Sequence, residues 1–179
     1  MAEDQQYGNL TDKGAVKDME IRDMEPADAD IVTGFLSELN VVEAAISADR
    51  DLSQQAGSAH FDHLCEEIEA QGGFCLVVEL EGKLLGCLFA APESMPGFFI
   101  KPEYRDYGEI RDIYVVPDAR GEGLARRLIN AAEERFRKMG FKQIGLYALT
   151  GNRDAIDVYE RLNFEHYEVF MRRNIKENG

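Results

Sequence analysis

One stretch constrains the fold most, because it passes from an apolar run through a glycine-rich turn into an amphipathic segment. The apolar run at 109–116 favours a strand, and Pro117, which has no backbone N–H to donate, ends it. The turn that follows contains Gly121 and Gly123, whose lack of a side chain lets a ligand approach the backbone. A single apolar stripe then predicts a helix of about five turns, closed by Gly140. Its members are Leu124, Ala125, Leu128, Ile129, Ala132, Phe136 and Met139.

The remaining apolar residues follow the two periods of helices and strands. The clearest signal is a hairpin, because two apolar runs at 74–80 and 84–90 flank Glu81-Gly82-Lys83. A hairpin followed by alternating strands and helices predicts an α/β (α+β) fold, with a mixed sheet and helices on both faces. The other expected elements are a strand at 19–22, helices around 31–39 and 61–68, an aromatic-rich loop at 91–107, a strand at 144–149, a helix at 154–162 and a last strand at 168–172.

Length and charge limit the classes of protein to which the chain can belong. Its 179 residues suffice for one domain, which we place at 18–174 between a flexible leader at 1–17 and a flexible tail at 175–179. No apolar run approaches the roughly 20 residues that cross a bilayer, and no signal-peptide pattern opens the chain. We therefore expect a cytoplasmic protein without a membrane partner. The net charge of −14 argues against nucleic acid. It either attracts a cationic ligand or is a solubility or salt adaptation.

The glycine-rich turn has the chemistry of a phosphate site. The first N–H groups of a helix are unpaired and carry partial positive charge, so they stabilise a bound anion. Arg126 and Arg127 make this helix start locally basic in an acidic chain. The P-loop pattern is absent, and the dinucleotide fingerprint fails because Arg126 stands at its third glycine. Either a different phosphate ligand binds here, or Gly121 and Gly123 only shape the turn.

Two blocks of residues together resemble one enzyme family. Arg120-x-x-Gly123-x-Ala125 is similar to motif A, [Q/R]-x-x-G-x-[G/A], of the GNAT superfamily of N-acetyltransferases. Asn152-x-x-Ala155-x-x-x-Tyr159 is similar to the family's second block. The resemblance covers roughly residues 19–173 and implies a mostly antiparallel mixed sheet of about six to seven strands. Asn163 departs from the family's usual glycine, at a turn where asparagine tolerates a left-handed backbone.

The resemblance implies acetyl-CoA as the acetyl-donating cosubstrate. Backbone N–H groups of the turn would hold its pyrophosphate, and the fourth strand of the family, which splays from the fifth, would pair with its pantetheine. The residues implied to contact the cofactor are Ile113, Tyr114, Val115, Arg120, Gly121, Glu122, Gly123, Leu124, Ala125, Arg126, Asn152 and Ala155.

The same resemblance assigns the chemistry to three side chains. Tyr159 matches the family's tyrosine that faces the thioester sulfur, where a phenol can donate a proton to the leaving thiolate. Glu109 and Asp112 are candidates for the base that deprotonates the acceptor amine, or one of them grips a cationic acceptor. They differ in strand parity and point to opposite faces unless a bulge intervenes.

Other polar residues receive smaller roles. His60 and His63 lie three apart on a helix, but no third ligand accompanies them, so we expect no metal and assign them to the lining of the acceptor pocket. Three cysteines are read as reduced, buried thiols.

The implied reaction moves acetyl from acetyl-CoA to a primary amine by direct attack in a ternary complex. A small cationic amine is slightly favoured over a protein amine, and a homodimer is possible by base rate. The alternative is a non-catalytic acyl-CoA-binding module that keeps the turn without the chemistry.

Overall fold

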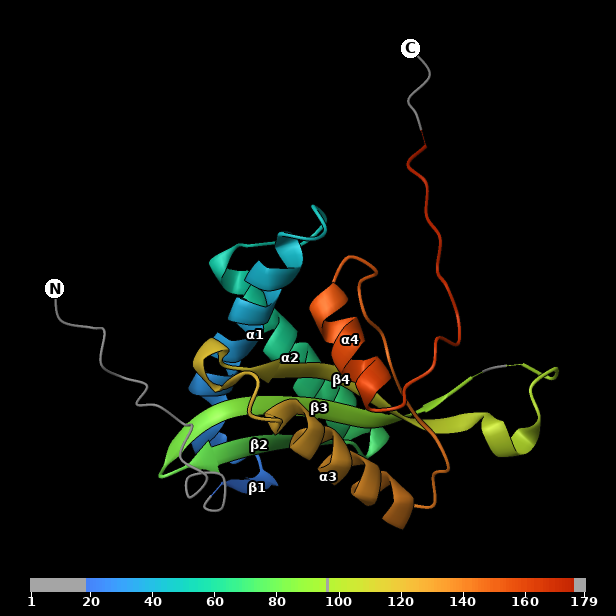
Figure 1. Ribbon diagram of the computed structural model, residues 1–179, viewed down its shortest axis with the longest axis horizontal. Helices are drawn as coiled ribbons and strands as arrows, with labels where there is room; N and C mark the ends of the chain where they lie inside the picture. Colours follow the sequence, from blue (N-terminus) through green and yellow to red (C-terminus); the bar gives the residue numbers. More distant parts are fainter. Residues whose placement is uncertain (1–18, 96, 176–179) are drawn as a thin grey trace, which may run out of the picture.

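A five-stranded sheet in the order β1-β2-β3-β4-β5 forms the centre of the fold (Figure 1). The computed structural model describes residues 19–95 and 97–175, so the expected leader at 1–17 and most of the tail lie outside the described residues. Pairs β1–β2, β2–β3 and β3–β4 are antiparallel, and β4–β5 is parallel. The sheet is therefore mixed and mostly antiparallel, as predicted. Nowhere in the described ranges is a helix both long and apolar enough to cross a bilayer.

The observed elements follow the predicted order as far as the last helix. The strands are β1 (Glu20–Asp23), β2 (Phe74–Leu80), β3 (Lys83–Ser94), β4 (Asp106–Val115) and β5 (Ile144–Leu146). The helices are α1 (Ala29–Ala44), α2 (Gln54–Gln71), α3 (Leu124–Lys138) and α4 (Arg153–Arg161), with short 3-10 turns η2 (Pro26–Asp28), η3 (Pro102–Tyr104) and η4 (Pro117–Ala119). The predicted loop at 91–107 is shorter, because β3 and β4 extend into both of its ends.

The prediction of a last strand at 168–172 is wrong for the described chain, which has five strands rather than six to seven. The alternation of residues favours an extended backbone, but a strand also needs a paired neighbour. β5 ends at Leu146 instead of the predicted Leu149, and the C-terminal segment runs away from the sheet (Figure 1). Arg172 is bound instead to Asp49 and to the Ser47 hydroxyl, in the connection between α1 and α2.

Helices cover both faces of the sheet, as the sequence predicts. On one face, Phe136 of α3 packs on Phe74 of β2 with ring centroids 5.1 Å apart. On the other face, Phe61 of α2 meets Phe89 of β3 at 6.1 Å, and Phe35 of α1 stacks on Tyr114 at 5.3 Å. The central strands β2 and β3 are thus buried on both sides, which is why their sequences are almost continuously apolar.

A bulge in β4 changes the direction of its side chains. Phe89 pairs with Asp112, but the next residue of β3, Ala90, pairs with Ile110, so Arg111 is an extra residue on β4. Glu109 and Asp112, an odd number of positions apart, therefore point to the same face, the one covered by α1 and α2. Without the bulge, the two side chains would point to opposite faces, as their strand parity predicts.

Pairing between β4 and β5 is short. It runs only from Gly108↔Ile144 to Ile110↔Leu146. From Asp112 to Val115, β4 keeps its β3 partners on one side and pairs with no described strand on the other. The two parallel strands therefore part at the bulge and leave one backbone edge of β4 open.

A substitution at Gly108 would test how tightly β4 packs on α3. A Cβ at this residue would clash with the ring of Phe136, which is 1% exposed and packed on all sides. We expect Gly108→Ala to lower the free energy of unfolding by about 1–3 kcal/mol. Urea unfolding measures this.

Gly34→Ala is the matched control. Gly34 lies on the exposed side of α1, with nothing within 4 Å of an added Cβ. Its substitution should raise stability by about 0.5–1 kcal/mol. Equal stability of Gly108→Ala and the parent chain would contradict the packing described.

Candidate functional site

The turn between β4 and α3 depends on two glycines with left-handed backbones. Gly121 has φ +85°, and Gly123, the N-cap of α3, has φ +76° and ψ 17°. Residues with a side chain rarely adopt such angles, so this turn requires glycine at both positions. An added Cβ at Gly121 would meet nothing within 4 Å, which leaves the surface of this turn open.

Helix α3 begins without a side-chain cap. Arg127 N–H donates to the Gly123 carbonyl at 3.1 Å and is the first intrahelical bond. Among the described residues no protein acceptor faces the N–H groups of Leu124, Ala125 and Arg126. Such a helix start attracts an anion through its free donors and its dipole.

The three arginines around this turn are used differently. Arg127 donates to the Met19 carbonyl at 2.8 Å, which ties the helix start to the chain before β1. Arg120 donates from Nε to the Val115 carbonyl at 3.0 Å, and its guanidinium lies 5.7 Å from the Tyr114 ring centroid. Arg126 is exposed. Arg120 and Arg127 therefore hold the turn in place, and Arg126 is the arginine best placed to meet an anion.

The expected cofactor strand, residues 113–115, lies along the open edge of β4. Tyr114 is 3% exposed, stacks on Phe35 and donates a hydrogen bond to Glu38. Its side chain therefore belongs to the core, and only its backbone can contribute to a site in the gap.

Helix α4 carries the second sequence block. The Asn152 side-chain oxygen accepts from Ala155 N–H at 3.3 Å and so caps the helix. Asn163 has φ +66°, the left-handed backbone expected of it. The Tyr159 ring meets Phe164 edge-on at 5.9 Å. Burial, with smaller effects from the charges of Asp112 and Glu43, raises the pKa of Tyr159 to about 12, so its phenol keeps its proton at neutral pH.

A cavity of 2040 Å³ brings several of these residues together. Its walls come from all four helices, from β4 and β5, from the loop between β3 and β4 and from the C-terminal segment, and both Asp112 and Tyr159 line it. Its charged lining is mainly acidic: the carboxylates are Glu43, Asp49, Asp51, Asp112, Glu133, Glu160, Glu165 and Glu168, and the Arg and Lys residues are Arg50, Lys101, Arg111 and Arg172. Such a lining favours a cationic ligand.

His60 of α2 is the partner of Asp112 inside this cavity. Its Nε2 lies 3.0 Å from Asp112 Oδ2, and the two side chains are 43% and 16% exposed. The hydrogen bond with Asp112 raises the pKa of His60 above its ordinary value, against the effect of burial. The sequence placed His60 only at the pocket wall, because 52 residues separate it from Asp112 and no local pattern joins them.

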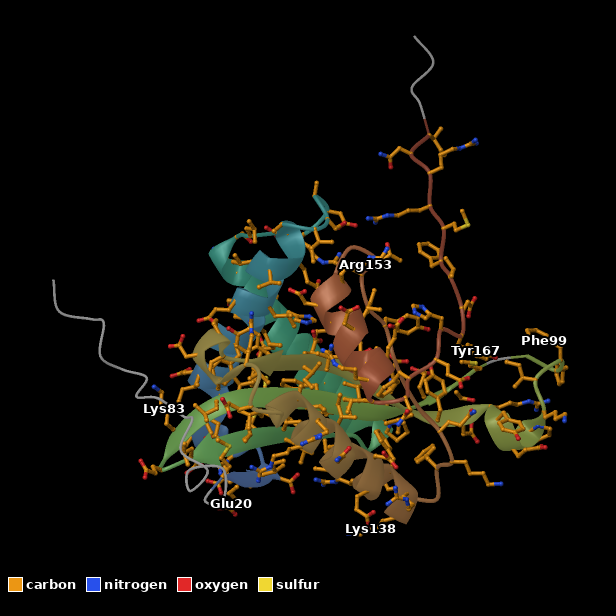
Figure 2. The ribbon with its side chains drawn as sticks, in the orientation of Figure 1. Glu20, Lys83, Phe99, Lys138, Arg153 and Tyr167 are labelled. Atoms are coloured by element: carbon orange, nitrogen blue, oxygen red, sulfur yellow. The ribbon has the colours of Figure 1, made fainter. Side chains whose placement is uncertain are left out.

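Glu109, the other candidate base, is held away from this cavity's chemistry. Tyr107 Oη donates to its Oε2 at 2.8 Å, and Arg111 Nη1 donates to its Oε1 at 2.6 Å. The Glu109 side chain is 5% exposed. It lines an adjoining cavity of 660 Å³, which shares Tyr147, Tyr167 and Phe99 with the large cavity. Figure 2 shows Tyr167 and Phe99 on the same side of the molecule.

The other two histidines pair with nearby acids. His63 Nε2 lies 3.7 Å from Glu67, and His166 Nε2 lies 2.9 Å from Glu160. In the described chain no three His, Cys, Asp or Glu side chains are grouped so as to hold a metal ion.

Comparison with known proteins places these features in a family. The sequence model of the acetyltransferase (GNAT) family matches residues 42–164. The uncharacterized N-acetyltransferase YjgM of Escherichia coli (strain K12) is 32% identical over 130 residues, which cover 73% of this chain and 74% of that protein. Mycothiol acetyltransferase of Saccharomonospora viridis is 35% identical over 102 residues, which cover 54% of this chain and 31% of that protein. The chain thus spans less than a third of that relative.

Solved structures share the fold at low sequence identity. A tetramutant of the BH1408 protein from Bacillus halodurans superposes with a TM-score of 0.73 at 17% identity, over 87% of this chain and 99% of that one. Aminoglycoside N-acetyltransferase AAC(6')-Iy in complex with CoA has a TM-score of 0.64 at 19% identity, over 88% and 95% of the two chains. Because the family model spans more than half of the sequence, we conclude that this chain belongs to the GNAT acetyltransferase family and is an acyltransferase.

Proposed function

We propose that this acyltransferase moves the acetyl group of acetyl-CoA to a primary amine, and that its acceptor is a small cationic amine. The observation that carries the proposal is the open edge of β4 beside the uncapped start of α3. These two features offer a row of strand amides and a group of helix amides along one continuous path.

The residues present fit the donor. The N–H groups from Gly121 to Arg126 would hold the pyrophosphate, because Gly121 and Gly123 leave the turn surface free of side chains. The backbone of Ile113 and Val115 would pair with the pantetheine in the gap left by β5. When bound, CoA supplies the acetyl group as an activated thioester. Asn152 and Ala155 would act indirectly, by capping α4 and so orienting Tyr159.

Proton removal from the acceptor is assigned to the pair of Asp112 and His60. An alkylamine of the lysine type has a pKa near 10.4 and is charged at neutral pH, so it must lose a proton before it can attack. Asp112 and His60 lie 3.0 Å apart in the cavity that Tyr159 also lines. Both oxygens of Glu109 are already engaged, which makes it the weaker candidate for this step.

Two donors would stabilise the negative charge that develops during transfer. A backbone N–H on the open edge of β4 would face the acetyl oxygen, a contribution of about 3–4 kcal/mol where one such donor has been removed from another enzyme. Tyr159 would donate its proton to the leaving sulfur, because burial keeps the phenol protonated.

The acidic lining of the cavity supports a cationic acceptor. Its carboxylates outnumber its arginines and lysines, and they come from four separate parts of the chain. AAC(6')-Iy, one neighbour by fold that is solved both with CoA and with the bisubstrate analogue CoA-S-monomethyl-acetylneamine, is an aminoglycoside N-acetyltransferase by name. Its low identity makes it support for the acceptor class rather than for a particular compound.

Thiol release tests the proposed reaction. Acetyl-CoA is incubated with the enzyme and with matched sets of polyamines, aminoglycosides, amino acids and neutral or anionic amines. The proposal expects amine-dependent release that is fastest with the polycationic compounds. Binding of acetyl-CoA without thiol release from any amine would refute it, and preferred acetylation of an anionic amine would refute the acceptor class.

Tyr159→Phe is expected to lower kcat by about 10²–10⁴-fold, because the variant loses the donor to the leaving sulfur. Its affinity for CoA should stay within about twofold of the parent value, because the proposed proton donation to sulfur takes place in the transition state and not on binding. Stopped-flow thiol detection and calorimetric titration measure the two quantities. An unchanged kcat would remove Tyr159 from the mechanism.

Asp112→Asn is expected to shift the pH dependence of kcat/KM. Asp112 raises the pKa of His60, so its loss lets that pKa fall. The ascending limb of the profile should then move to lower pH, and the plateau should fall by about 10–100-fold because a weaker base remains.

His63→Gln is the control for this prediction. His63 is exposed on the same helix and pairs with Glu67, so its substitution should leave the ascending limb in place. An Asp112→Asn limb at the parent pH would show that the pair does not accept the proton.

A further inference from the structure

Arg111 is the extra residue of the β4 bulge, and its side chain joins three elements. Nη1 donates to Glu109 Oε1 of β4 at 2.6 Å, and Nη2 donates to Glu93 Oε2 of β3 at 2.7 Å. Nη2 also lies 3.1 Å from Gln71 Oε1, at the end of α2. The guanidinium therefore bridges the two strands on either side of the register shift and the helix that covers them.

The centre of this cluster, Arg111 with Glu109, is largely buried, whereas Glu93 is 33% exposed and Gln71 is exposed. The Arg111 side chain is 16% exposed and that of Glu109 is 5% exposed. Tyr107 fixes the second oxygen of Glu109, so the carboxylate cannot rotate away from Arg111. The bidentate reach of a guanidinium is needed here, because a lysine ammonium is a single point that cannot span Glu93, Glu109 and Gln71 together.

The bulge keeps this arrangement at a cost. Arg111 Nε is buried and has no hydrogen-bond partner in the described chain. Buried polar atoms without partners are rare in native proteins and call for a compensating role. The residue after Arg111 is Asp112, whose direction depends on the bulge that this side chain fixes.

We infer that Arg111 is a positioning residue, which holds the β4 bulge in the shape that aims Asp112 at His60. The inference rests on the proposed function, because it explains how the proton-accepting pair is set. Glu109 then does not act as the base, but binds Arg111 and keeps its guanidinium in place.

Several charged groups besides Asp112 surround His60. Glu43 comes from α1, Glu67 from its own helix, and Arg50 from the connection that follows α1. Tyr159 of α4 lines the same cavity and is protonated at neutral pH. Glu67 also interacts with the charge of Arg111, but the loss of that positive charge would raise the pKa of His60, whereas a displaced Asp112 lowers it.

The decisive variant is Arg111→Met combined with Glu109→Gln. Arg111→Met alone leaves two carboxylates crowded without their cation, so it loses stability for a reason unrelated to position. The double variant removes that charge imbalance and should recover most of the lost Tm. We expect its kcat to stay about 10–100-fold below the parent value, because small misplacements of reacting groups have effects of that size. Its KM for acetyl-CoA should change less than about twofold.

A readout independent of activity separates this inference from the proposed function. The pKa of His60 is measured by NMR, with the signals of the three histidines assigned from single substitutions. In the double variant and in Arg111→Lys, the His60 pKa should fall toward the ordinary value near 6.5. If the parent enzyme released no thiol with any amine, the proposed function would fail, yet this titration would still test whether Arg111 positions Asp112 beside His60.

Arg22→Met is the matched control. Arg22 also bridges two carboxylates, Asp28 at 2.7 Å and Glu79 at 2.6 Å, on the β1 side of the sheet. Its loss should lower Tm while leaving the His60 pKa and the pH profile unchanged. Parent values of kcat and of the His60 pKa in the double variant at Arg111 and Glu109 would overturn the inference and reduce Arg111 to a neutralising charge.

Discussion

Strand β4 is paired along its length with β3 but with β5 only as far as Ile110, and the rest of the site depends on that difference. Backbone amides on an open edge inside a protein need partners, because unpaired peptide groups away from water are costly. The bulge at Arg111 lies where the two parallel strands part. It also sets Asp112 on the face that α1 and α2 cover, so the same irregularity lies at the start of the edge that we propose for the cofactor and directs Asp112 toward His60.

The start of α3 and the large cavity differ in the sign of their charge. The uncapped start of α3 and the exposed Arg126 are positive and suit phosphates. The large cavity beyond β4 has a mainly acidic lining and suits a cation. In a chain of net charge −14, the helix start is a local exception, and the acidic cavity continues the general surface. The donor and the acceptor would thus approach the thioester position from regions of opposite sign.

Local patterns predicted much of the fold. The hairpin turn, with φ +50° at Glu81 and +79° at Gly82, and the turn into α3 are fixed by neighbouring residues, so short sequence signals were sufficient. The last strand was predicted wrongly, because an extended, alternating segment says nothing about whether an edge is available to pair with it. The pairing of His60 with Asp112 and the contact of Arg111 with Glu109 were not predicted. Both depend on a β4 bulge that has no sequence signature of its own. At the site, the sequence supplied the family pattern. It could not show that both oxygens of Glu109 are engaged by neighbours, whereas Asp112 faces the cavity with His60.

The most direct measurement of the account is a crystal structure of the enzyme with CoA. The account predicts pyrophosphate oxygens within hydrogen-bonding distance of the N–H groups between Gly121 and Arg126. It also predicts pantetheine along the open edge of β4 at Ile113 and Val115, with its sulfur on the side of Tyr159. CoA bound on another face, or β5 paired with β4 beyond Ile110 in place of the pantetheine, would contradict it.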